Sequence, residues 1–126
     1  ELRVFKTAPD KCMRKLARQL TLGVEALRDG FALLDKDPAA AEPLALEAHK
    51  AERRMKKIYR RGLVVLLDKE RFRQGYVEQH DDPQELAMDF MVHVTKHREI
   101  YRHLSHAADR LGRVSELLRD IIVKLV

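Results

Sequence analysis

The sequence predicts an all-α protein, a three-helix up-down-up bundle, from three observations. Charged residues make up 36% of the 126 residues, with only five glycines, four prolines and no tryptophan, which suits a soluble helical domain. Apolar residues recur at steps of three and four along three separate stretches, as on one face of a helix. Polar or proline-containing segments divide these stretches.

We expect the first helix to begin after Asp10, a residue type that caps helix N-termini well. It should end near Asp35, because Pro38 disfavours helix at the residue before it. The predicted core-facing stripe is Met13, Leu16, Leu20, Val24, Leu27, Phe31 and Leu34.

The second helix should start in the region 38–43 and run to about Leu67. The segment from Asp68 to Asp82 is polar and contains Gly75, so we expect it to be irregular or partly helical. The residues of the second helix that we expect to be buried are Leu44, Ala48, Ala51, Met55, Ile58 and Val65.

The third helix should open at Pro83 and run to the C-terminus, a length of about 65 Å. Because the first two helices are too short to cover it, it must either bend or leave apolar surface for another contact. Its stripe is Leu86, Phe90, Val94, His97, Tyr101, Leu104, Ala108, Leu111, Ser115, Leu118, Ile122 and Leu125. The predicted common core of the bundle is Leu20, Leu27, Met55, Ile58, Leu104, Leu111 and Leu118.

Four segments carry a family resemblance in their order and rough spacing. They are ELRVFKTAP at 1–9, HKAERRMKKIYRRGLVVLLD at 49–68, DDPQEL at 81–86 and REIYRHLSHAADR at 98–110. Together they resemble the PhoU-like regulators of phosphate transport, distant PhoU relatives associated with Pit-type phosphate permeases. Full members of such families look like two three-helix units in tandem, so the resemblance implies that this chain is the C-terminal half of such a protein. Residues 1–8 would then be the tail of a preceding helix, and residues 9–126 the C-terminal three-helix unit.

The resemblance also implies a function. It is non-catalytic, accessory control of inorganic phosphate uptake through contact with a membrane phosphate permease, in the cytoplasm and peripherally at the inner face of the membrane. The implied partners are that permease and either the missing N-terminal half or a second copy. No apolar run approaches the ~18 residues that a membrane span needs.

The same resemblance implies carboxylate pairs at E-x-x-x-D spacing, which put two acids one helical turn apart to share a cation. Glu52 matches the glutamate, but Lys56 stands where the aspartate belongs. Asp109 matches the aspartate, but Ser105 replaces the glutamate. Glu52 and Asp109 are therefore the candidate ligands of a divalent or ferric metal, although we expect no cofactor, since an ammonium repels a cation. Two other pairs have this spacing and are interpreted as solvated carboxylates: Glu25 with Asp29, and Glu116 with Asp120.

We expect neither a metal site at the histidines nor a reactive nucleophile at the single cysteine. His93 and His97 have the i, i+4 spacing of a chelating pair, but both fall on the apolar side of the third helix, so we expect packing. His103 and His106 should face solvent. Cys12 lies near a helix start, where the dipole and nearby lysines can lower its pKa, yet without a resolving cysteine we interpret it as an incidental thiol.

The second helix carries the strongest charge signal. Between residues 49 and 61 there are seven bases and a single acid. Six of these bases lie on the arc opposite Met55 and Ile58, a ridge suited to an anionic ligand, an acidic partner surface or anionic lipid. The alternative is a solvated face offset by acids on neighbouring helices. We do not expect nucleic acid as the partner, since only Tyr59 lies nearby for stacking. We call these residues the basic ridge: Lys50, Arg53, Arg54, Lys57, Arg60 and Arg61.

Enzymatic functions find little support, because no nucleophile elbow, P-loop or dinucleotide-binding motif is present. The Glu-x-x-His element of di-iron bundles is also absent from the sequence. Two alternatives to the regulator remain open: a metal-binding helical-bundle protein or enzyme, and a bare scaffold or dimerisation module.

Overall fold

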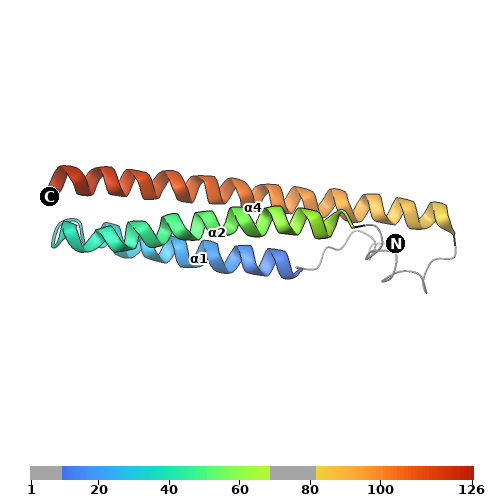
Figure 1. Cartoon of the computed structure of the whole chain (residues 1–126), viewed down its shortest axis with the longest axis horizontal. Coiled ribbons are helices and arrows are strands. Elements are labelled where there is room, and N and C mark those ends of the chain that lie inside the picture. The colour runs from blue at the N-terminus through green and yellow to red at the C-terminus, as the bar shows by residue number, and fades with distance from the viewer. Residues whose placement is uncertain (1–9, 69–81) are drawn as a thin grey trace.

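The structure, a computed structural model, describes residues 10–68 and 82–126 and confirms the all-α three-helix bundle. Helix α1 spans Lys11–Ala32, a 3₁₀ turn (η2) spans Pro38–Ala41, α2 spans Glu42–Leu66 and α4 spans Pro83–Leu125. The three α-helices run up, down and up beside one another (Figure 1). The predictions for residues 1–8 and for the segment 69–81 lie outside the described residues.

Aspartates at the starts of the helical segments hold the first backbone N–H groups, as the sequence predicts for helix N-caps. The Asp10 carboxylate accepts from Met13 N at 2.7 Å at the start of α1. Asp82 does the same for Gln84 N at 3.0 Å at the start of α4. The caps therefore fix two of the three helix starts, and a proline in the first turn of α2 and of α4 suits the fixed backbone there.

The core is narrow because small residues face one another between the helices. Ala45, Ala48 and Ala51 of α2 and Ala108 of α4 are all buried. A Cβ added at Gly23 would lie 2.5 Å from a Leu111 methyl group, so α1 and α4 pack at very short range there. The predicted core is confirmed, with Leu20, Ile58 and Leu104 partly buried against its centre and the other four fully inside it: Leu27, Met55, Leu111 and Leu118.

Four stripe predictions are wrong. Val24 and Phe31 are 51% and 36% exposed, because their side of α1 faces the surface between α1 and α4, where the described chain places no further helix. Val65 is 51% exposed, and its neighbour Leu66 takes the buried place, one turn after buried Gly62. Leu125 is 54% exposed, in the last turn of α4.

Helix α4 runs unbroken for 43 residues, longer than α1 with 22 and α2 with 25. Tyr101 packs with Met13 and Leu66, at the beginning of α1 and the end of α2, and closes the bundle there. The first part of α4 continues past these helix ends (Figure 1). We call residues 83–92, which precede the contact of Val94 with this cluster, the α4 extension. Its Met88 and Met91 are 64% and 66% exposed, so the expected uncovered apolar surface is present.

Candidate functional site

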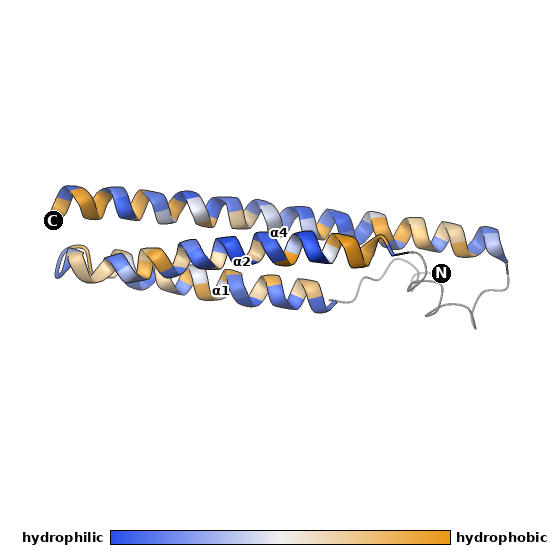
Figure 2. Ribbon diagram, in the orientation of Figure 1, coloured by the Kyte–Doolittle hydropathy of each residue, from blue (hydrophilic) through white to orange (hydrophobic). Residues whose placement is uncertain are grey.

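The basic ridge lies on the outward face of α2, where a hydrophilic stretch occupies the middle of the helix (Figure 2). It points away from the core because Ala48, Ala51 and Met55, which share the opposite face, are buried. All six ridge residues that the sequence singled out are exposed: Lys50, Arg53, Arg54, Lys57, Arg60 and Arg61.

The ridge has little compensation from acids. Within residues 10–68 and 82–126, Lys50 is the one ridge residue with an ion pair, to Glu47 at 4.0 Å, and both side chains are about half exposed. No ion pair joins these six residues to an acid on a neighbouring helix in the described chain, and the alternative of a solvated face stays open. Like charges one turn apart, such as Arg53 and Lys57, destabilise a helix by about 0.2–0.5 kcal/mol per pair. The ridge therefore carries a small electrostatic cost that an anionic partner would relieve.

The structure brings the two candidate metal ligands together around a lysine. Lys56 Nζ lies 3.1 Å from Glu52 Oε2 on its own helix and 3.1 Å from Asp109 Oδ1 on α4. Hydrogen bonds to Asp109 and then to Glu52 raise the pKa of Lys56, so the ammonium form is favoured. Lys56 thus holds the place between the two carboxylates that a shared cation would take, and it ties α2 to α4.

Glycine on α4 makes room for this arrangement. A Cβ added at Gly112 would lie 2.6 Å from the carboxyl carbon of Glu52, whose side chain is 13% exposed. His49 Nδ1 adds a contact at 3.4 Å to the other oxygen of the same carboxylate. Glycine at position 112 therefore has a packing reason, because a larger residue there would displace Glu52.

The two other carboxylate pairs with E-x-x-x-D spacing lie on the surface. Glu25, Asp29, Glu116 and Asp120 are all exposed, and Asp29 contacts the guanidinium of Arg28 at 3.0 Å. In the parts of the chain that the structure describes, no three histidine, cysteine or carboxylate side chains gather in a way that suits a metal ion. Whether metal binds at Glu52 and Asp109 stays a prediction.

His97 is buried, as its place on the apolar stripe predicts, while His103 and His106 are exposed. His97 Nδ1 lies 2.9 Å from the backbone oxygen of His93, and the two rings are 4.1 Å apart. His97 Nε2 lies 3.8 Å from Asp10, whose carboxylate comes from the start of α1. The pair therefore packs within the bundle; burial, and secondarily the nearness of His97, lower the pKa of His93.

Sequence reasoning missed a polar contact at the closed end of the bundle. The Tyr101 hydroxyl donates to Asp10, 91 positions away, and Tyr101 itself is 3% exposed. Burial and this hydrogen bond raise the pKa of Tyr101 far above its ordinary range. No pattern within the sequence links these two residues, since each looks like an ordinary cap or stripe position when taken alone.

Cys12 belongs to the same cluster. Its thiol donates to the Ile58 backbone oxygen at 3.8 Å. It fits only because position 62 is glycine, where a Cβ would lie 2.3 Å from the sulfur. Burial raises the pKa of Cys12 against the lowering effects of the Tyr101 hydrogen bond and of Lys15, which agrees with the interpretation of an incidental thiol.

A comparison with protein-family models, with curated proteins and with solved structures returns no match for this chain. Among the helices described, none combines the length and the apolar character needed to cross a membrane. The site is therefore interpreted from its own geometry: an outward cationic surface on α2 and an internally neutralised carboxylate pair at the seam between α2 and α4.

Proposed function

We propose that this chain is a non-catalytic accessory regulator of inorganic phosphate transport, and that the basic ridge is the surface with which it contacts a membrane phosphate permease. The observation that carries the proposal is the ridge itself, six exposed cations on one helix face, of which Lys50 alone has an ion pair in the described chain. The link to phosphate transport rests on the resemblance of four sequence segments to PhoU-like regulators.

The chemistry of the ridge suits an acidic protein surface at the membrane. Its lysine and arginine side chains are long, flexible and solvated. Such side chains affect the rate of association and the orientation of the partners more than the affinity. The pairing of Lys56 with Glu52 and Asp109 supports a binding rather than a metal-dependent role, because the carboxylates already share a cation from the protein. The protein would then sit peripherally at the inner face of the membrane.

The test is a charge reversal of Arg53, Lys57 and Arg60 to glutamate. Binding is measured by flotation with phosphatidylcholine vesicles that contain a Pit-type phosphate permease, with empty vesicles as reference, and phosphate uptake is followed in the same vesicles. The wild-type chain should bind the permease vesicles and alter uptake, and the variant should bind at least tenfold more weakly. Binding should also weaken as salt rises past ~0.15 M.

A matched control carries the same change in net charge away from the ridge, with Arg18, Lys36 and Arg98, all exposed, changed to glutamate. This control should bind like the wild type. If the ridge variant binds and regulates as well as the control, the ridge is a solvated face and the proposal is wrong. Equal binding of the wild type to empty vesicles containing phosphatidylglycerol would instead identify lipid as the anionic ligand and would also overturn it.

A further inference from the structure

Helix α4 carries a second stripe beside the buried one. It advances in steps of three and four residues, so its members share one side of the helix. Its charge is uneven, with carboxylates at the beginning and an arginine and a histidine toward the end. The stripe consists of Glu85, Asp89, Val92, Lys96, Ile100, His103, Ala107, Arg110 and Val114.

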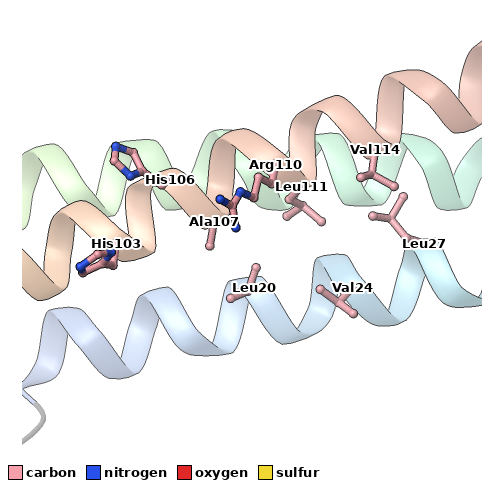
Figure 3. A pocket seen from close by; sticks show the side chains of 9 residues that line it. All are labelled: Leu20, Val24, Leu27, His103, His106, Ala107, Arg110, Leu111 and Val114. Carbon is pink, nitrogen blue, oxygen red and sulfur yellow. The ribbon is translucent and has the colours of Figure 1, made fainter.

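The later part of this stripe borders a groove of about 320 Å³ between α1 and α4 (Figure 3). We call it the α1–α4 groove. Its walls include Val24 of α1 and Val114 of α4, which are 51% and 37% exposed. Arg110 and two histidines line it as well, with exposed Arg113 one turn further on. The groove is thus apolar with a cationic border.

The α4 extension has the opposite character. Asp82 and the extension together contain three acids, Asp82, Glu85 and Asp89, and no lysine, arginine or histidine. Met88 next to them is 64% exposed. Glu85 and Asp89 already make contacts within their own chain, so what matters for pairing is the sign of their charge and their place on the stripe.

We propose that the α1–α4 groove is filled by the α4 extension of a second copy, in a symmetric dimer with antiparallel α4 helices. Asp89 and Arg110 lie 11 and 10 residues on either side of Ile100, which is about 16 and 15 Å along the helix. If the two helices cross near Ile100, Asp89 of each copy meets Arg110 of the other. Val92 then faces Ala107, and the contact closes on itself because both halves are the same.

The distribution of charge along α4 favours the antiparallel arrangement over a parallel one. Parallel α4 helices would place acid against acid and arginine against arginine. Near the axis Lys96 faces His103 of the other copy, and Glu99, 3.5 Å from His103, supplies the compensating acid. The net charge of +5 on each chain opposes association, but charges beyond about 8 Å are largely screened at physiological salt. The ridge on α2 stays outside this contact, so the dimer does not depend on the proposed function.

The test uses sedimentation velocity of the whole chain at a series of concentrations in 0.15 M salt. The wild type should dimerise. Asp89→Arg alone and Arg110→Asp alone should each raise the dimer Kd at least tenfold, because every interface then holds two like-charge pairs. A one-to-one mixture of the two variants should recover a dimer, since arginines on one copy meet aspartates on the other, and the double variant should also recover it.

Two matched changes on the far side of α4, Arg98→Asp and Glu116→Arg, should leave the dimer unchanged; both residues are exposed and lie off the stripe. Thermal unfolding followed by circular dichroism checks that each variant is folded. A wild type that stays monomeric, even if its groove accepts an added acidic amphipathic peptide, overturns the proposal. A dimer that tolerates both single changes, or a mixture that fails to associate, overturns the antiparallel pairing.

Discussion

Lys56 and Lys57 are neighbours on α2, yet they lie in opposite environments. Lys56 points to the seam with α4, where Glu52 and Asp109 both lie 3.1 Å from its ammonium. Lys57 points outward with the rest of the basic ridge and has no ion pair among the described residues. The two differ by 100° around the helix, and that rotation separates a tie between helices from a surface available to a partner. Counting charges along α2 does not distinguish them.

The residues that face the other helices should therefore be sensitive to substitution, and those of the outward face should tolerate it. The largest expected effect is at Gly62, which makes room for Cys12 beside Tyr101. Gly62→Ala should lower the free energy of unfolding by about 1–2 kcal/mol, because overpacking costs about 1–3 kcal/mol and helix propensity returns up to about 1. Urea denaturation measures the change.

The control for this prediction is the double variant Gly62→Ala with Cys12→Ala, which removes the sulfur that the new methyl group meets. The double variant should be more stable than the sum of the two single changes predicts. If the changes in the free energy of unfolding were strictly additive, the new methyl group would not be in contact with the Cys12 sulfur. The steric explanation for glycine at position 62 would then be wrong.

Tyr101 gives the next effect, in the pH dependence of stability. Its pKa is raised in the folded chain, so the neutral phenol is the stable form there, while the unfolded tyrosine ionises near its ordinary value of 10.0. Stability is then fully present below pH 10 and is lost above it, by about 1.4 kcal/mol per pH unit for one proton. Tyr101→Phe should remove this slope.

The measurement compares urea denaturation at pH 9.5, 10.5 and 11 in a Cys12→Ala background, because burial also raises the pKa of that thiol. Lys56→Met serves as the reference and should keep the Tyr101 slope. A Tyr101→Phe variant that loses stability with pH as fast as its parent would show that another group causes the alkaline loss.

The smallest expected effect comes from the direct comparison of Lys56 with Lys57. Lys56→Met should lower the free energy of unfolding by about 0.5–1 kcal/mol, a value limited by solvent screening because the lysine side chain is 40% exposed. Lys57→Met should be neutral or slightly stabilising, since it relieves like-charge contacts worth about 0.2–0.5 kcal/mol each. Equal losses at the two positions would break the distinction between seam and ridge.

The helices and their starts were readable from the sequence because their causes are local. Asp10 and Asp82 cap the helices that they precede, and apolar steps of three and four identify the helical faces. The periodicity could not tell which part of a stripe meets a neighbour: Val24 continues the α1 stripe but faces the open side of the bundle. Helix existence is a local property, whereas burial depends on what lies opposite.

The site divides in the same way. The position of the ridge on α2 followed from the angle of its residues around one helix. The tie from Lys56 to Asp109 depends on how two helices are aligned along their length, which one sequence does not specify. The contact between Tyr101 and Asp10 joins residues 91 positions apart and had no signal at all.

The alanine- and glycine-lined contact between the helices also constrains how this protein can change. With Ala45, Ala48, Ala51 and Ala108 fully inside, the backbones already lie close, and almost any larger side chain would push them apart. Substitutions on the outer faces meet no such barrier. A change of charge on the basic ridge or the α4 stripe should therefore alter what the protein binds while the bundle itself stays the same.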